Sequence, residues 1–195
     1  MRVREIRYER LFNLRNYNNE RIGVAIELDE GESEAEALGK AMDLVYRMHL
    51  TAEAARRLFM QLGDVSERIP HLCEQAERLR SALAELEAKY NECISRAKEI
   101  AERLARGEKV EDLKTIECEI PYLEKRIEEK KRDLKHVEDE IKKLTELKRE
   151  LERELKQLYE RLRRGELPSR EEVPELLEKV AGLEVRALAA EREEW

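Results

Sequence analysis

The chain of 195 residues is poor in the residue types that make loops and turns. It has four prolines, seven glycines and 5% aromatic side chains, against 44% charged side chains. Loop-rich β proteins and disordered linkers use more glycine and proline, so the composition excludes both classes. Since soluble domains are typically about 25% charged, the excess favours long helices or a coiled coil.

Long hydrophobic runs are also missing. No stretch comes near the roughly 18 apolar residues that a membrane-spanning helix needs. Residues 1–10 carry charge and lack the apolar core of a signal peptide. We therefore expect a cytoplasmic protein without a membrane partner.

Residues that commonly bind metals or perform catalysis are few and scattered. The chain has three cysteines and three histidines, at Cys73, Cys93, Cys118, His49, His71 and His136. None of them forms a CxxC or HExxH motif, and there is no P-loop, GxGxxG or GxSxG motif. We expect no catalytic residue, no metal site, no cofactor and no enzymatic activity, with the thiols buried on helices.

The charges are unevenly distributed around a formal net charge of −7. Residues 71–164 hold equal numbers of basic and acidic side chains, whereas residues 165–195 are acidic. A neutral surface of mixed charge is typical of helices whose opposite charges face each other, and such a surface binds nucleic acid poorly. Abundant Glu, Lys and Arg with few amides is also a trend of thermophile proteins.

Two heptad seams dominate the middle of the chain. Apolar residues recur at alternating spacings of four and three from Leu72 to Leu104, and again from Leu113 to Leu162. Gly107 separates the seams and suits a helix C-terminus. The pattern predicts an antiparallel coiled-coil hairpin over residues 66–164, with its turn near Gly107.

The second seam is longer than the first, has lysine at two of its positions and spans a proline. Pro121 predicts a kink or a restart of the helix, and Lys130 and Lys148 are interpreted as polar residues that set register or oligomeric state. Folding at Gly107 leaves residues 148–162 without an intrachain partner. A second copy, the N-terminal module or the C-terminal helix could cover them, and we favour a homodimer.

The two ends of the chain predict smaller elements. Apolar and polar residues alternate over 3–14 and 21–29, which predicts two strands. A two-stranded sheet is only marginally stable by itself, and pairing with a second chain would extend it. Ser33 and Glu36 form a capping box for one helix, and Thr51 caps another that ends at Gly63. A short acidic helix begins near Ser169 and could dock on the stalk or a partner protein.

The expected fold class is α+β, mostly α, in three segments. Residues 1–65 form a module of a β-hairpin and helices, residues 66–164 form the coiled-coil hairpin, and residues 165–195 form the acidic C-terminal helix. The coiled coil occupies about half of the chain, so it decides the architecture.

One segment, residues 12–21, holds four of the five asparagines. Asparagine is common in hairpin turns, which is a purely structural explanation. The functional alternative is a loop for single-stranded nucleic acid, in which arginines meet phosphates, a tyrosine stacks on a base and amides bond base edges. The candidate residues are Arg7, Arg10, Arg15, Asn16, Tyr17, Asn18, Asn19 and Arg21.

The same region resembles a protein family. Residues 7–17 read RYERLFNLRNY, followed by RIGV at 21–24 and an acidic Gly31-Glu32 turn. This resembles small, uncharacterised proteins of phages and archaeal mobile elements that read roughly YE-LFNLGNYEN-RIGV, with Arg15 standing where they usually have glycine. The resemblance covers about a fifth of the chain. Some of these proteins belong to DNA replication and recombination modules, so the resemblance implies a DNA-related role.

Two functional hypotheses follow. In the first, the protein is a non-enzymatic homodimer whose N-terminal module binds nucleic acid, in particular single-stranded DNA. In the second, it is a structural or adaptor coiled-coil protein that contacts protein partners through the coiled coil or the acidic tail, without nucleic-acid binding.

Overall fold

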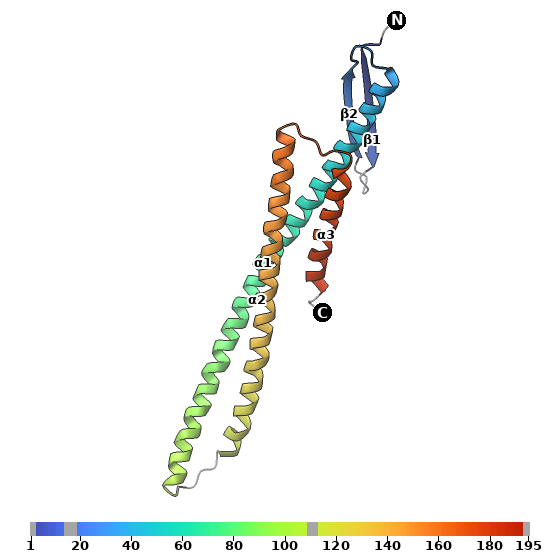
Figure 1. The fold of residues 1–195 in the computed structure, drawn as a ribbon. Coiled ribbons are helices and arrows are strands. Elements are labelled where there is room, and N and C mark those ends of the chain that lie inside the picture. Colours follow the sequence, from blue (N-terminus) through green and yellow to red (C-terminus); the bar gives the residue numbers. More distant parts are fainter. Residues whose placement is uncertain (1–2, 14–18, 109–112, 193–195) are drawn as a thin grey trace. The chain divides into compact units, whose positions relative to one another are not determined.

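The computed structural model describes residues 3–13, 19–108 and 113–192, and for residues 113–117 and 188–192 it describes the backbone alone. The elements in chain order are β1 (Glu5–Asn13), β2 (Asn19–Glu27), α1 (Glu34–Ala105), α2 (Leu113–Arg163) and α3 (Glu172–Arg192) (Figure 1). The expected fold class, α+β and mostly α, is confirmed.

Contacts divide the chain into two compact units. One unit comprises residues 1–65 with 147–195, and the other comprises residues 66–146. Helices α1 and α2 therefore contribute to both units. Residues 147–164 group with the two ends of the chain, whereas the sequence-based division placed them with residues 66–146.

The two strands form an antiparallel hairpin in the first unit. Their register runs from Glu5 opposite Glu27 to Asn13 opposite Asn19. Even-numbered residues such as Tyr8 and Val24 are half-buried, apart from the buried Phe12 and the exposed Arg10, whereas odd-numbered residues are exposed. The predicted alternation is confirmed in the described strands; Leu14 lies outside the described residues.

Helix α1 begins as predicted but does not end as predicted. The Glu36 amide donates to Ser33 Oγ at 3.2 Å and the Ser33 amide donates to Glu36 Oε2 at 3.0 Å, which confirms the capping box. The predicted helix boundaries at Thr51 and Gly63 are wrong, because α1 is continuous through both. Thr51 is buried and its hydroxyl donates to the Arg47 carbonyl oxygen at 2.8 Å. A glycine inside a helix costs only about 1 kcal/mol, which the continuing apolar face outweighs.

Replacement of Gly63 by alanine is expected to stabilise the protein. A Cβ atom at Gly63 would meet no atom within 4 Å, and the backbone there is helical. The free energy of unfolding should rise by about 0.5–1 kcal/mol, because alanine loses less backbone entropy. Urea unfolding, monitored by circular dichroism, measures the change in this free energy. In the control Gly107→Ala, where φ is 80°, the free energy should fall by about 1 kcal/mol. A gain at both positions would contradict the assigned backbone conformations.

Proline does not interrupt either long helix. Pro70 lies inside α1 and Pro121 inside α2, so α2 does not restart at Pro121. The other alternative for this residue, a kink, stays a prediction. The predicted turn at Gly107 is confirmed. Its amide donates to the Leu104 carbonyl at 2.9 Å and the Glu108 amide to the Arg103 carbonyl at 3.1 Å, which ends α1 with a left-handed residue.

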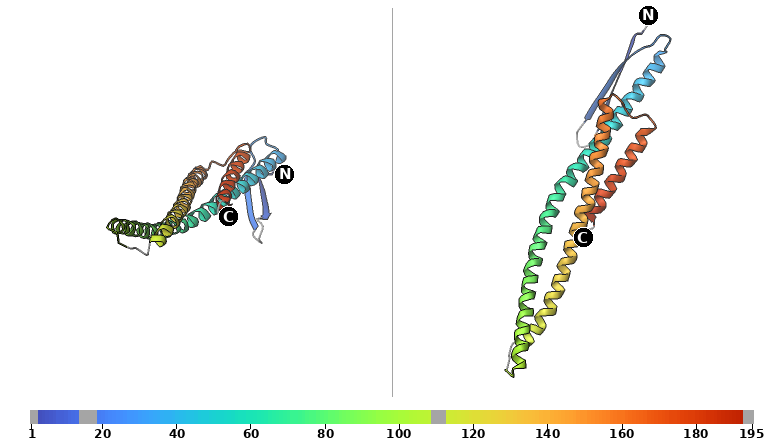
Figure 2. Two further views of the ribbon diagram at one scale, coloured as in Figure 1. Left: turned by 90° about the horizontal axis from the view of Figure 1, so that it is seen from below. Right: turned by 60° about the vertical axis from the view of Figure 1, so that its left-hand side comes forward.

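In the unit of residues 66–146, α1 and α2 run antiparallel and side by side (Figure 2). Opposite charges join the helices, as in Arg80–Glu138 at 2.6 Å and Lys131–Glu87 at 2.9 Å. Leu104, at the end of the first seam, is 44% exposed, which corrects its assignment to the core. The buried apolar residues of this unit are Leu72, Ala76, Leu86, Cys93, Ile100, Leu123, Ile127, Val137 and Leu144.

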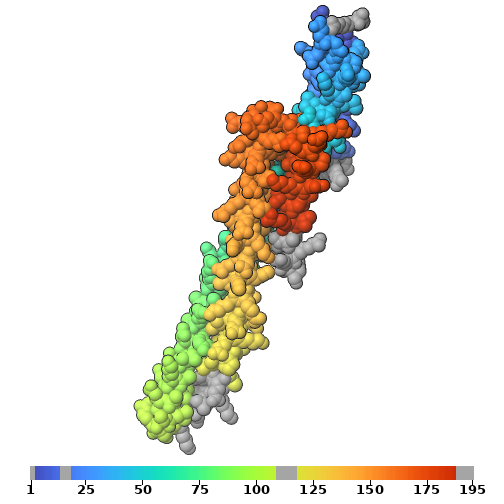
Figure 3. All heavy atoms as spheres, in the orientation of Figure 1, coloured from blue at the N-terminus to red at the C-terminus, as the bar shows by residue number. Residues whose placement is uncertain are grey.

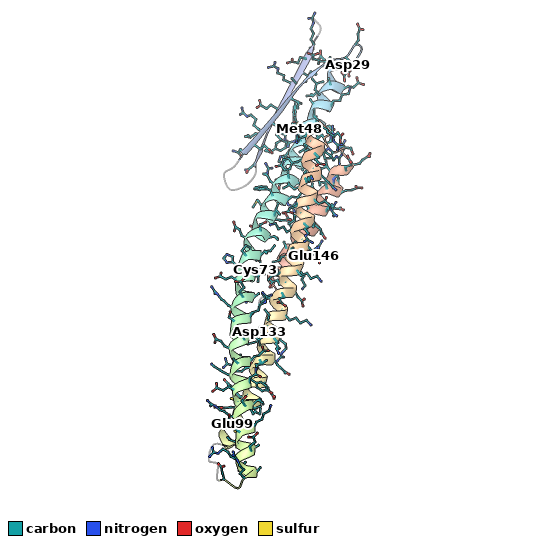
Figure 4. The ribbon with its side chains drawn as sticks, turned by 90° about the vertical axis from the view of Figure 1, so that its left-hand side faces the viewer. Asp29, Met48, Cys73, Glu99, Asp133 and Glu146 are labelled. Carbon is teal, nitrogen blue, oxygen red and sulfur yellow. The ribbon has the colours of Figure 1, made fainter. Side chains whose placement is uncertain are left out.

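The thiols differ in environment, which corrects the expectation that all are buried. Cys93 is buried in the cluster with Leu86, Leu123 and Ile127, whereas Cys118 and Cys73, which is labelled in Figure 4, are exposed. Burial and then the nearby Glu119 carboxylate raise the pKa of the Cys93 thiol.

An aromatic disulfide reagent should therefore modify two thiols per chain quickly and the third slowly. Because burial and a raised pKa both disfavour the thiolate of Cys93, its reaction should be at least about tenfold slower at pH 8. The absorbance of the released thiolate measures both phases. A Cys93→Ala variant should lose only the slow phase, and loss of a fast phase would contradict the assignment.

The seam over residues 148–162, expected to lack an intrachain partner, is covered by the chain itself. In the first unit α2 buries Leu147, Leu151, Leu155 and Leu158, while α1 buries Ala54, Leu58 and Val65, and α3 buries Val173, Val180 and Leu183. The premise that favoured a dimer here is wrong, because α1 and α3 of the same chain supply apolar side chains to this core.

Helix α3 lies against α2 in the same unit (Figure 3), and ion pairs hold it there. Lys179 Nζ lies 2.5 Å from Glu154 Oε2, and further pairs join Arg57 to Glu184 and Arg186 to Glu150. The helix starts with a second capping box, since the Ser169 amide donates to Glu172 Oε2 at 2.7 Å.

No helix in the described ranges has a stretch long and apolar enough to cross a bilayer.

Candidate functional site

Half of the predicted nucleic-acid residues belong to the described hairpin. Arg7 and Arg10 lie on β1, and Asn19 and Arg21 lie on β2. The other four, Arg15, Asn16, Tyr17 and Asn18, lie outside the described residues. The hairpin therefore forms the candidate site, and its two faces must be considered separately.

The exposed face of the hairpin carries Arg7 and Arg21 beside glutamates. Arg7 Nε lies 2.5 Å from Glu5 Oε1, and Arg21 Nε lies 3.2 Å from Glu9 Oε1. Glu9 stands opposite Gly23, where a Cβ atom would lie 3.2 Å from Glu9 Cγ, a tight contact. With Glu27 also on this face, acidic groups outnumber the basic groups among its described residues.

Arg10 points to the opposite face from Arg7 and Arg21, by the alternation of the strand. Its guanidinium carbon lies 5.3 Å from the centroid of the Phe12 ring, within range of a cation–π contact. The structure thus separates the three described arginines, two on one face and one on the other, and does not gather them into one positive surface. Asn19 is exposed and faces Asn13 across the last pair of the hairpin.

A cluster between the hairpin and α1 anchors the two. The Phe12 and His49 rings stack with their centroids 3.7 Å apart and an interplanar angle of 7°. His49 Nδ1 is 2.9 Å from Glu20 Oε2, and Arg56 Nη1 is 3.3 Å from Glu20 Oε1. Met48, the neighbour of His49 in α1, is labelled beside the strands in Figure 4. The hairpin is therefore held to α1 by ring stacking and by one carboxylate shared between two side chains.

Arg56 also forms an ion pair with Glu53 on α1, at 3.0 Å. Burial alone would lower the pKa of Arg56, but the hydrogen bond with Glu53 and the charge of Glu20 together raise it above its ordinary value. Arg56 therefore stays cationic, and its guanidinium pairs with the Glu20 carboxylate within the anchor.

Replacement of His49 by alanine is expected to loosen this anchor. Loss of the stack and of the bond to Glu20 should lower the free energy of unfolding by about 1–2 kcal/mol. Hydrogen exchange of strand amides should accelerate most, which mass spectrometry can follow. His136→Ala, at an exposed position of α2, is the matched control and should change neither quantity appreciably. Equal effects of the two substitutions would contradict the anchor.

The sequence did not identify the anchor residues Glu20, His49 and Arg56 as a group. His49 and Arg56 are seven residues apart, which places them two turns apart on one face of a helix, and this is the only signal available in advance. Glu20 comes from a strand whose distance from α1 is decided by tertiary packing. Its role could not be read from local patterns.

The open end of the hairpin forms a hollow of about 610 Å³. It is lined by Val3, Arg4, Glu5, Glu27, Leu28 and Glu30. These side chains mix charges and include no cysteine, histidine or serine. Across the residues that the structure describes, no three His, Cys, Asp or Glu side chains are grouped to hold a metal ion.

The chain was also compared with known proteins. No protein-family model, no curated protein and no solved structure matches it.

Proposed function

We propose that this protein is a non-enzymatic, homodimeric adaptor, in which the N-terminal hairpin joins two copies and the helices present a mixed-charge surface to protein partners. The observation that carries the proposal is the charge balance of the hairpin. Its described strands hold three arginines and four glutamates, and two of the arginines lie beside glutamates. Such a surface lacks the positive stripe that a nucleic-acid backbone attracts.

The helical pair supports the same proposal. Most described positions of its apolar seam are buried or half-buried within the chain, so the two helices form an arm without a partner helix. The segment of α1 in residues 66–105 alone would extend about 60 Å at 1.5 Å per residue. An arm of this length with balanced surface charge suits the spacing or recruitment of protein partners.

The second candidate function is binding of single-stranded nucleic acid by the hairpin. What favours it is that the ion pairs of Arg7 and Arg21 are exposed, and exposed pairs contribute less than about 1 kcal/mol each. A phosphate group could therefore displace Glu5 or Glu9 at little cost. Arg15, Asn16, Tyr17 and Asn18 would add contacts from the loop.

One titration separates the two functions. Fluorescence anisotropy with labelled single-stranded oligonucleotides, at about 50 mM and 200 mM salt, should detect no binding if the protein is an adaptor. Nucleic-acid binding predicts instead an affinity that falls steeply with salt and that Arg7→Ala/Arg21→Ala reduces. The matched control is Arg78→Ala/Arg96→Ala, which removes two exposed, ion-paired arginines from residues 66–146.

Oligomeric state is the second test of the adaptor. Sedimentation equilibrium should give a mass twice the 23.1 kDa of one chain at micromolar concentration. A monomer at all concentrations would overturn the homodimer, and salt-dependent binding sensitive to Arg7 and Arg21 would overturn the adaptor.

A further inference from the structure

The hairpin has backbone groups that point away from it along both edges. The Leu28 amide donates to the Arg4 carbonyl oxygen at 3.1 Å, in the same register as the strand pairs. Even-numbered residues are therefore the hydrogen-bonded pairs, and the N–H and C=O groups of odd-numbered residues point outward. The sheet of the described chain has two strands, so neither edge is paired with a third strand.

The two edges differ in what a further strand would meet. The outward positions of β1 include Glu5, Arg7 and Glu9, which are long and charged. In β2 the central outward positions are Gly23 and Ala25, which let another backbone approach closely. On the half-buried face, β2 contributes the apolar residues Ile22, Val24 and Ile26, whereas β1 has Arg10 at the corresponding level.

We propose, on the basis of the homodimer above, that β2 pairs antiparallel with β2 of a second copy, with Val24 opposite Val24 on the twofold axis. In this register Ile22 lies opposite Ile26 of the second copy, and Arg21 lies opposite Glu27. The dimer then has a four-stranded sheet in the order β1-β2-β2-β1. Its half-buried face is a continuous apolar surface across the axis, and opposite charges meet at both ends of the new pairing.

Other twofold registers are less favourable. Pairing must keep odd residues opposite odd residues, because only those have free backbone groups. An axis at Arg21 puts like charges opposite each other, and an axis at Ile22 or Gly23 puts Glu20 opposite Val24 or Ile26. An axis at Ala25 leaves only five residues in register and puts Glu27 opposite Gly23. Over the seven residues 21–27, the axis at Val24 pairs apolar with apolar and acidic with basic side chains, and it leaves Glu20 beyond the last charged pair.

Cysteine cross-linking tests the register directly. In a background with Cys73→Ser, Cys93→Ala and Cys118→Ser, the variant Val24→Cys should form a disulfide-linked dimer under mild oxidation. Position 24 is a non-hydrogen-bonded pair in the proposed pairing, where Cα atoms approach to about 4.5 Å and a disulfide can form. Ile22→Cys is the control on the same strand, and Tyr8→Cys is the control for the β1 edge. Both should cross-link at least tenfold more slowly.

Charge reversal gives a second test that does not need cysteine. Arg21→Glu puts two glutamates opposite each other at both ends of the pairing, and Glu27→Arg puts two arginines there. Each should weaken the dimer about tenfold by sedimentation equilibrium, and the double variant Arg21→Glu/Glu27→Arg should restore the constant to within about threefold. Arg7→Glu, on β1, should leave the constant unchanged.

The outcomes distinguish this inference from the function on which it rests. A wild-type monomer overturns both. A dimer in which Ile22→Cys or Tyr8→Cys cross-links faster than Val24→Cys overturns the register or the edge and leaves the homodimer standing. A dimer in which the double charge reversal fails to restore affinity overturns the pairing of Arg21 with Glu27.

Discussion

Replacement of Leu151 by alanine is expected to lower the free energy of unfolding by about 3–4 kcal/mol. The Leu151 side chain is fully buried in the unit of residues 1–65 and 147–195, where helices α1 and α3 also bury apolar side chains. Truncation removes its contacts and leaves a cavity that the surrounding helices fill only in part. Urea unfolding, followed by circular dichroism at 222 nm and by exchange of α3 amides, measures the loss.

Leu104→Ala is the matched control for this substitution. Leu104 also lies on a long helix and in the predicted heptad pattern, but it is 44% exposed. Its replacement should cost less than about 0.5 kcal/mol. If Leu151→Ala were as mild as Leu104→Ala, the seam over residues 148–162 would need a second copy to be covered, as the sequence suggested.

Replacement of Arg68 by alanine is expected to cost about 3 kcal/mol. Arg68 forms an ion pair with Glu140, whose side chain is only 4% exposed, in the unit of residues 66–146. Removing the guanidinium leaves a carboxylate that is shielded from water and has lost this counter-charge. The large cost comes from that stranded charge, more than from the net strength of the pair.

Two comparisons test this explanation. Arg68→Met/Glu140→Leu removes both charges and should return the free energy of unfolding to within about 1 kcal/mol of the wild type. Arg80→Ala breaks the pair with the exposed Glu138 and should cost less than about 1 kcal/mol. A double variant as unstable as Arg68→Ala would show that packing of the arginine stem, and not the stranded carboxylate, determines the loss.

Several elements of the fold could be predicted because their signals are local. The heptad spacing from Leu72 to Ile100 indicates which helix face is buried, and the alternation of β1 and β2 indicates which strand face is half-buried. The capping boxes at Ser33 and Ser169 and the left-handed turn at Gly107 depend on residues close in sequence. Each of these signals acts over a few residues and needs no distant partner.

Helix boundaries predicted from a local penalty alone were wrong. Thr51, Gly63 and Pro121 all have low helix propensity, yet both helices continue through them. The penalty at each position is local, whereas the compensating energy comes from apolar side chains on other elements. The covering of the seam over residues 148–162 likewise depends on apolar side chains of α1 and α3, which are distant in sequence.

The candidate site shows the same division. Residue types in the hairpin suggested phosphate contacts for Arg7, Arg10 and Arg21, but strand alternation places Arg10 on the other face, and Glu5 and Glu9 lie beside the remaining two. The pairing of Glu20 with His49 and Arg56 joins a strand to a helix about thirty residues away. Periodicity and capping follow from the chain's local geometry, so composition and spacing were enough to establish a helical hairpin with a small β module. Helix continuity, the covering of the second seam and the counter-ion of each charge depend on contacts between distant segments, and only folding in three dimensions determines them.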